Sequence, residues 1–211
     1  MRATKYVYQL LSAICLIGLV FIMPIMAQER RLPDAIRSEY LPRRQDDAAR
    51  EQDGVNVRST LSDRDISELE QHVFDLVNQE RVSNGSPPVK MDWKLSELAR
   101  IQAEYMMTHN LFRHIDVEGR GPQLRAKDAG IQCHIDENLG WQSGRDSPII
   151  KIDDLHRSFM NEPKNEHNHR SILLGINRRY VGIGIAVSQN EVYMVQDYAD
   201  SDPSAVVEPN N

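Results

Sequence analysis

Apolar residues recur at helical spacing in two long stretches of the chain. The first begins at Asp63 and stops at Ser83-Asn84-Gly85, and its apolar face consists of Ile66, Leu69, Val73, Leu76 and Val77. The residues Pro87-Pro88 then force an extended link. The second stretch has a charged outer face and an inner stripe formed by Leu95, Leu98, Ala99, Gln102, Tyr105, Met106 and His109. The pattern therefore predicts two amphipathic helices before residue 110.

Three shorter helical segments follow, and residues that favour helix ends bound each of them. Gly121-Pro122 begins one that ends at Gly130, because proline suits the first helical position and glycine the left-handed end. Ser147-Pro148 begins the next, which Pro163 ends. Its apolar stripe is Ile149, Ile152, Leu155 and Phe159. A helical turn from His169 to Leu174 stops at Gly175.

Alternating residues predict the strands. Ile135 to Trp141 is typical of one strand, and Val181, Ile183, Ile185 and Val187 alternate with small residues in another. The turn Ser188-Gln189-Asn190 leads into a partner strand, Glu191 to Ala199. We expect one α+β domain over residues 63–200, a three-layer α/β/α sandwich with a small antiparallel sheet between helices.

The N-terminal segment has the pattern of an export signal. Arg2 and Lys5 precede an apolar run from Leu10 to Met26, and Ala27 fits the small-residue rule for cleavage. We predict a signal peptide over residues 1–27 and a secreted or periplasmic protein. The alternative is an uncleaved anchor with the domain facing outside, because the run approaches the length that spans a bilayer. Charged residues 28–62 indicate a disordered linker, and residues 201–211 a flexible tail.

The composition and charge of the chain limit the classes of molecule that it can bind. The chain has 211 residues, 40% of them hydrophobic, which suffices for one domain with a core. Its net charge of −6 becomes more negative once Arg2 and Lys5 are removed, so we expect no nucleic-acid partner. Cys133 is the single cysteine after the signal, so no intramolecular disulfide can form, and we interpret it as a buried small hydrophobe. We expect a monomer.

Four separate segments carry candidate chemistry. His114 ends Phe112-Arg113-His114 in a loop, and Glu137 lies on the predicted strand beside apolar neighbours. A buried carboxylate there has a raised pKa unless a cation or donor stands opposite. Glu162 ends the fourth helix, and His169 follows a polar loop. The motifs HExxH, GxSxG and CxxC and a phosphate-binding glycine loop do not occur in the sequence, so no standard catalytic motif identifies an enzyme.

Taken in order, these segments resemble the CAP superfamily, which includes cysteine-rich secretory, antigen 5 and pathogenesis-related proteins and their bacterial SCP-like relatives. The resemblance runs from about Leu69 to Ala199 and also includes Leu76-Val77-Asn78-Gln79-Glu80-Arg81, Glu137-Asn138, His169-Arg170 and Val181-Gly182-Ile183-Gly184. It implies a cleft formed by His114, Glu137, Glu162 and His169, whose two histidines are the candidate metal ligands. Lys164 to Asn168 looks like an insertion and places His167 two residues from His169, so either can be the second histidine.

Two imidazoles and two carboxylates have two physical uses. They can hold a divalent ion, zinc above all, or form a metal-free network of hydrogen bonds. Three functions follow: an exported domain that binds a metal and an extended lipid, glycan or peptide; a metal-assisted hydrolase of peptides or cell-wall material with Glu137 or Glu162 as general base; and a non-catalytic interaction module of the envelope.

Overall fold

The computed structural model describes residues 61–164 and 166–205, so the predicted signal peptide and nearly all of the predicted linker lie outside the described residues. The described helices are α3 (Asp63–Ser83), α4 (Trp93–His109), α5 (Pro122–Asp128), α6 (Pro148–Met160) and α7 (His169–Leu174). The strands are β1 (Lys90–Met91), β2 (Ile135–Ser143), β3 (Tyr180–Val187) and β4 (Glu191–Ala199). Within this part of the chain, no helix combines the length and the apolar character needed to cross a membrane.

The sheet has the order β1-β3-β4-β2, which places β2 at one edge. The pairs β2–β4 and β3–β4 are antiparallel, as the sequence predicts. The sheet as a whole is mixed and not purely antiparallel, because Lys90 and Met91 pair in parallel with Tyr180 and Val181. This short strand follows the two prolines, where the sequence indicates only an extended link; two residues are too few to show a period.

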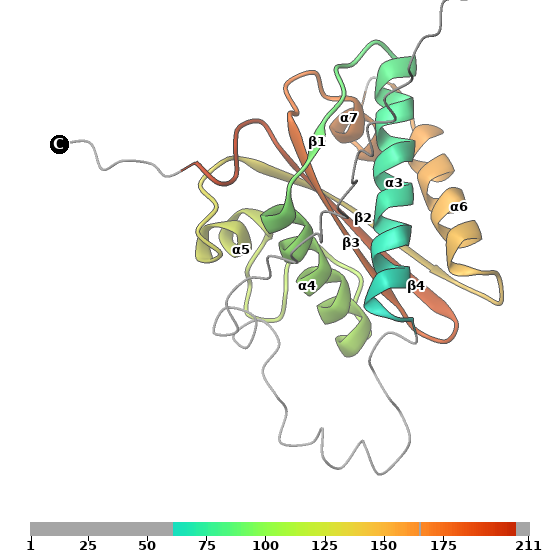
Figure 1. Ribbon diagram of the computed structural model, residues 1–211. Helices are drawn as coiled ribbons and strands as arrows, with labels where there is room; N and C mark the ends of the chain where they lie inside the picture. The colour runs from blue at the N-terminus through green and yellow to red at the C-terminus, as the bar shows by residue number, and fades with distance from the viewer. Residues whose placement is uncertain (1–60, 165, 206–211) are drawn as a thin grey trace, which may run out of the picture.

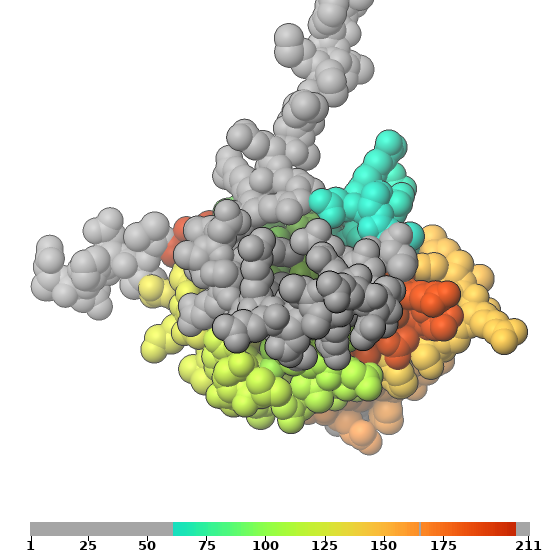
Figure 2. Space-filling model, turned by 90° about the horizontal axis from the view of Figure 1, so that it is seen from below, coloured from blue at the N-terminus to red at the C-terminus, as the bar shows by residue number. Residues whose placement is uncertain are grey.

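Helices cover both faces of the sheet, which confirms the predicted three-layer arrangement (Figure 1). One face packs against α3, α6 and α7 around a core that includes Val73, Ile152, Leu173 and Ile183. The other packs against α4 and α5. Seen from below, the orange-red end of the β3–β4 hairpin lies beside the gold surface of α6 (Figure 2).

Two glycines of β3 allow α4 to lie directly on the sheet. A Cβ atom on Gly182 would stand 2.1 Å from the carbonyl carbon of Leu95, and one on Gly184 would stand 2.1 Å from that of Ala99. No side chain fits there, because the atoms in the way belong to the helix backbone. The small residues that alternate along this strand are therefore needed because the backbone of α4 packs directly against that face.

Side-chain caps and a left-handed glycine define several of the helix ends. Ser62 caps α3 in a reciprocal pair of hydrogen bonds with Asp65, and Asp92 accepts a hydrogen bond from the amide of Leu95 at the start of α4. Gly130 has φ +74°, as a left-handed helix end requires. Two details of α6 differ from the prediction. Its last residue is Met160, three positions before Pro163, and Ile149 is exposed because it lies in the first turn, outside the core.

Arg81 is a structural residue that the sequence pattern does not reveal. It lies near the end of α3 and is fully buried. Its guanidinium donates hydrogen bonds to the backbone carbonyls of Pro87, Leu173, Gly175 and Arg178. One side chain thus joins the end of α3 to the segment between α7 and β3, which follows the cleft residues in the chain.

Candidate functional site

The first histidine–carboxylate pair joins the loop after α4 to the edge strand. Nδ1 of His114 lies 2.9 Å from Oε1 of Glu137. The Glu137 side chain is fully buried and that of His114 is about half exposed. Glu137 therefore holds the imidazole on its buried side, while the rest of the ring remains accessible to solvent.

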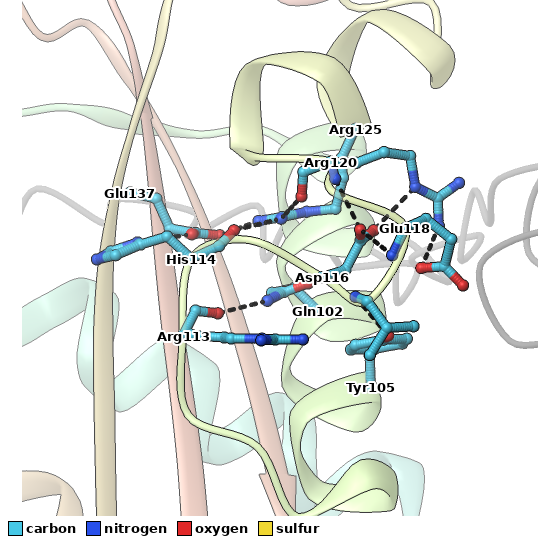
Figure 3. A network of polar contacts seen from close by, with 10 residues as sticks. Gln102, Tyr105, Arg113, His114, Asp116, Glu118, Arg120, Arg125 and Glu137 are labelled. Atoms are coloured by element: carbon cyan, nitrogen blue, oxygen red, sulfur yellow. Dashed lines mark hydrogen bonds and ion pairs between the residues drawn. The ribbon is translucent and has the colours of Figure 1, made fainter.

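Arg125 of α5 is the cation that the buried carboxylate requires. Its Nη2 donates to Oε2 of Glu137 at 2.5 Å, and both side chains are buried. Its Nη1 donates to the backbone carbonyls of His114 and Arg120. The burial of Glu137 predicted a partner of this kind, but nothing in the sequence pointed to residue 125. Figure 3 shows Arg125, Glu137 and His114 converging from α5, β2 and the loop.

Further polar contacts fix the loop that carries His114 (Figure 3). Gln102 of α4 donates to the carbonyl of Arg113, and the hydroxyl of Tyr105 accepts a hydrogen bond from the amide of Val117. The buried carboxylate of Asp116 accepts hydrogen bonds from the backbone amide and the Nε of Arg120. The loop is therefore held from both sides, and His114 has a defined position.

The second histidine–carboxylate pair lies at the start of α7. Nδ1 of His169 lies 2.6 Å from Oε1 of Glu162, whose Oε2 accepts a hydrogen bond from the amide of Arg170. The ring of Phe159 stacks on the imidazole with centroids 4.3 Å apart and planes 9° apart. Asn138 of β2 donates to the carbonyl of His169 and links this pair to the edge strand. The side chains of His169 and Glu162 are each about one-third exposed or less.

All four predicted cleft residues line one cavity of about 450 Å³. The consecutive strand residues Ile135, Asp136 and Glu137 also line it. Side chains of consecutive strand residues point to opposite faces, so the cavity reaches around the edge of β2 and does not lie on a single face. His114 and Glu137 come from the α5 side and His169 and Glu162 from the α7 side. His167 is exposed and lines the same cavity, so the choice between His167 and His169 as second ligand stays a prediction.

Asp197 is an acidic neighbour of the cleft that the sequence did not indicate. It pairs in register with Glu137 on the adjacent strand and is buried. Its Oδ1 atom has no hydrogen-bond partner among the described residues. Burial raises the pKa of the Asp197 carboxyl well above its ordinary value, and the charge of Glu137 raises it further, while the Arg125 guanidinium lowers it. Nothing in the sequence around Asp197, which lies between Gln196 and Tyr198, pointed to the cleft.

The donor set suits a weakly held metal better than a closed structural site. In each pair a carboxylate contacts Nδ1, so Nε2 is the ring nitrogen that can bind a metal. Carboxylate–histidine pairs of this kind orient metal ligands in many proteins. However, the described residues contain no group of three or more His, Cys, Asp or Glu side chains arranged to hold a metal. A metal held by His114 and His169 alone would need water or ligand atoms to complete its shell.

The remaining four histidines lie outside the cavity, and three of them have a local polar partner. Nδ1 of His109 lies 2.8 Å from the carbonyl of Tyr105, and the two rings stack. His72 of α3 contacts Asp153 of α6, and His134 contacts Asp136. His156 of α6 is buried, and neither ring nitrogen has a hydrogen-bond partner among the described residues. None of these four lines the cavity.

Helices on both faces of a mixed sheet, with two histidine–carboxylate pairs at its edge, define an α/β sandwich domain with a His/Glu cleft. The chain belongs to the cysteine-rich secretory protein family, CAP, whose family model matches residues 74–198. It is 28% identical over 131 residues to the uncharacterized protein YkwD of Bacillus subtilis, a match over 62% of this chain and 47% of YkwD. The chain thus spans about half the length of that curated relative.

Solved structures share the fold. An extracellular protein containing an SCP domain from Bacillus anthracis is 19% identical with a TM-score of 0.54, over 67% of this chain and 44% of that one. The CAP domain of enterococcal PrgA is 17% identical with a TM-score of 0.51, over 70% of this chain and 68% of that one. At these identities the likeness concerns the fold alone.

Proposed function

We propose that the protein is an exported binding domain whose cleft takes a divalent metal ion through His114 and His169 and holds an extended ligand beside it. The supporting observation is that a carboxylate engages Nδ1 of each imidazole. A neutral imidazole whose Nδ1–H is held in this way presents the lone pair of Nε2, the form in which histidine binds zinc.

The carboxylates favour binding over hydrolysis. A hydrolase needs a carboxylate that can accept the proton of an attacking water. Glu137 already lies between Arg125 and His114, and Glu162 lies between His169 and the amide of Arg170. When bound, a divalent ion supplies Lewis-acid polarisation of a water or a ligand oxygen. The protein's own contribution is to orient the two imidazoles and leave the remaining coordination positions to the ligand.

Zinc titration of purified protein tests the proposal. We expect about one equivalent of zinc to bind the wild type, and both His114→Ala and His169→Ala to abolish binding. His167→Ala is the matched control, because it removes a neighbouring imidazole that also lines the cavity. Zinc binding lost in His167→Ala and retained in His169→Ala would exchange the two assignments. Neither heat on titration nor zinc by elemental analysis would rule out the metal.

Export is the second part of the proposal. It is supported by the charged start and apolar run of residues 1–27 and by a fold relative described as extracellular. Expression with a C-terminal tag, followed by cell fractionation and N-terminal mass spectrometry, tests it. We expect tagged protein outside the cytoplasm that begins at Gln28 and sediments as a monomer. An intact N-terminus in the membrane fraction supports the anchored alternative, and cytoplasmic protein contradicts export.

A further inference from the structure

Two exposed aromatic side chains lie on the same two segments that carry His114 and Glu137. Phe112 precedes His114 by two residues in the loop, and Trp141 follows Glu137 by four residues on β2. Their ring centroids are 6.4 Å apart, with the planes tilted by 41°. Phe112 is 51% exposed and Trp141 is 41% exposed. Residues 29 positions apart thus form one aromatic surface, which we call the aromatic shelf.

The shelf and the first histidine–carboxylate pair share the same two segments of the chain. Residues two and four apart on a strand point to the same face, so Trp141 projects from the face of β2 that carries Glu137, about 13 Å along the strand. Phe112 lies in the loop after α4, two residues before His114. A chain molecule that enters the cavity and follows β2 in this direction passes over the two rings.

The backbone beside Phe112 and the indole of Trp141 are both supported before any ligand arrives. The amide of Leu111 donates to the carbonyl of Met106 at 2.9 Å, and the carbonyl of Arg113 accepts from Gln102. The backbone is therefore fixed on each side of Phe112. Trp141 pairs in register with Tyr193, whose buried ring lies 6.5 Å away and backs the indole. Ordering the shelf thus costs little entropy on binding.

We propose that the aromatic shelf is a binding subsite for a polysaccharide, on which sugar rings stack while the chain extends into the His/Glu cleft. The inference rests on the proposed function, because it assigns a chemical class to the extended ligand. A sugar ring has a face of C–H groups and a rim of hydroxyls. The flat aromatic faces suit the first, and the imidazoles and carboxylates of the cleft can hydrogen-bond with the second.

The shape of the shelf favours sugar rings over a lipid chain. Drug-sized ligands and acyl chains need a concave site that encloses most of their surface. The cavity at the edge of β2 is lined by neither Phe112 nor Trp141, so the rings form an open surface beside it. An open aromatic pair can stack on a planar ligand face without enclosing it.

The test uses a β-1,4-linked hexamer of N-acetylglucosamine and the full mature protein. We expect it to shift the NMR signal of the Trp141 indole N–H and to leave that of Trp93 unchanged. Affinity by calorimetry should fall about tenfold in Trp141→Ala and in Phe112→Ala, and Trp141→Phe should retain most of it because a ring remains. Ile149→Ala is the matched control, since Ile149 is 42% exposed on α6, and its affinity should equal that of the wild type.

Two results would overturn the inference. One is the absence of hexamer binding, or hexamer affinity that is equal in the wild type and in a folded Trp141→Ala variant. The other is that unlabelled extended peptides or phosphatidylcholine vesicles, and not the sugar, produce the Trp141 response. Hexamer binding by a wild-type protein that takes up no zinc keeps the shelf and removes the metal from the proposed function. Zinc uptake without a sugar response does the reverse.

Discussion

Arg125 and Glu137 form an ion pair that is buried on both sides, with Nη2 and Oε2 2.5 Å apart. Removal of one partner leaves an uncompensated charge in the interior. We expect Arg125→Ala to lower the free energy of unfolding by about 3–5 kcal/mol in urea denaturation. It should also free the loop of His114, because Arg125 holds the carbonyl of that residue.

Arg113→Ala is the control for this prediction. Arg113 lies in the same loop and is exposed, and only its backbone carbonyl takes part in the contacts described above. We expect its stability within about 0.5 kcal/mol of the wild type. The double variant Arg125→Met, Glu137→Leu should be more stable than Arg125→Ala, because it leaves no buried charge. An unchanged unfolding midpoint in Arg125→Ala contradicts the structural role of the pair.

Arg81 should be one of the most sensitive positions of the domain. Arg81→Ala leaves four backbone carbonyls without their donor, and each unsatisfied buried carbonyl costs about 1–3 kcal/mol. We expect a loss of at least about 3 kcal/mol by thermal or urea unfolding, and a partial rescue by Lys, which cannot donate in the same fork. Arg64→Ala in the exposed first turn of α3 should leave the unfolding midpoint unchanged. Equal midpoints for all variants argue against the buried clamp.

Gly182→Ala and Gly184→Ala should separate α4 from the sheet. Their Cβ atoms would stand 2.1 Å from backbone carbons of the helix, which cannot move as a flexible side chain can. We expect each variant to lose at least about 1–3 kcal/mol of stability by urea denaturation. Gly121→Ser is the control, because no atom lies within 4 Å of its Cβ and serine suits a helix N-cap. Wild-type stability in either β3 variant is the contrary outcome.

His156 should make the stability of the domain depend on pH. Burial lowers the pKa of this imidazole below its ordinary value of 6.5; the charges of Glu80 and Asp153 oppose the shift, and His72 adds to it. Below the unfolded pKa, the unfolded chain binds a proton that the folded chain resists, so this contribution to stability is lost as pH falls below about 6.5.

The measurement is the free energy of unfolding from pH 8 to pH 5. We expect His156→Leu to decline less over this range than the wild type, since it has no group to protonate at this position. His134→Gln is the control, because His134 is mostly exposed and should leave the slope unchanged. Parallel pH curves for the wild type and His156→Leu would exclude His156 as the cause.

The local signals in the sequence were strong enough to place helices and strands. Helix periodicity, the left-handed Gly130 and the alternation in β3 each depend on a few neighbouring residues, and the structure confirms these elements. The short parallel strand β1 was missed because its pairing with Tyr180 and Val181 joins residues 90 positions apart. The exposure of Ile149 was also missed, because an apolar stripe does not reveal that the first turn of α6 lies outside the core.

The sequence by itself determined the fold class, the family and the four residues expected in the cleft, because these depend on local patterns and on the order of short motifs along the chain. Only the tertiary structure decided that these four line one cavity around the edge of β2. It also supplied the partners that no motif announces: Arg125 under Glu137, Asp197 on the next strand, and Trp141 beside Phe112. Such partners follow from distances in space, and the same residue types at those positions are compatible with many other neighbours.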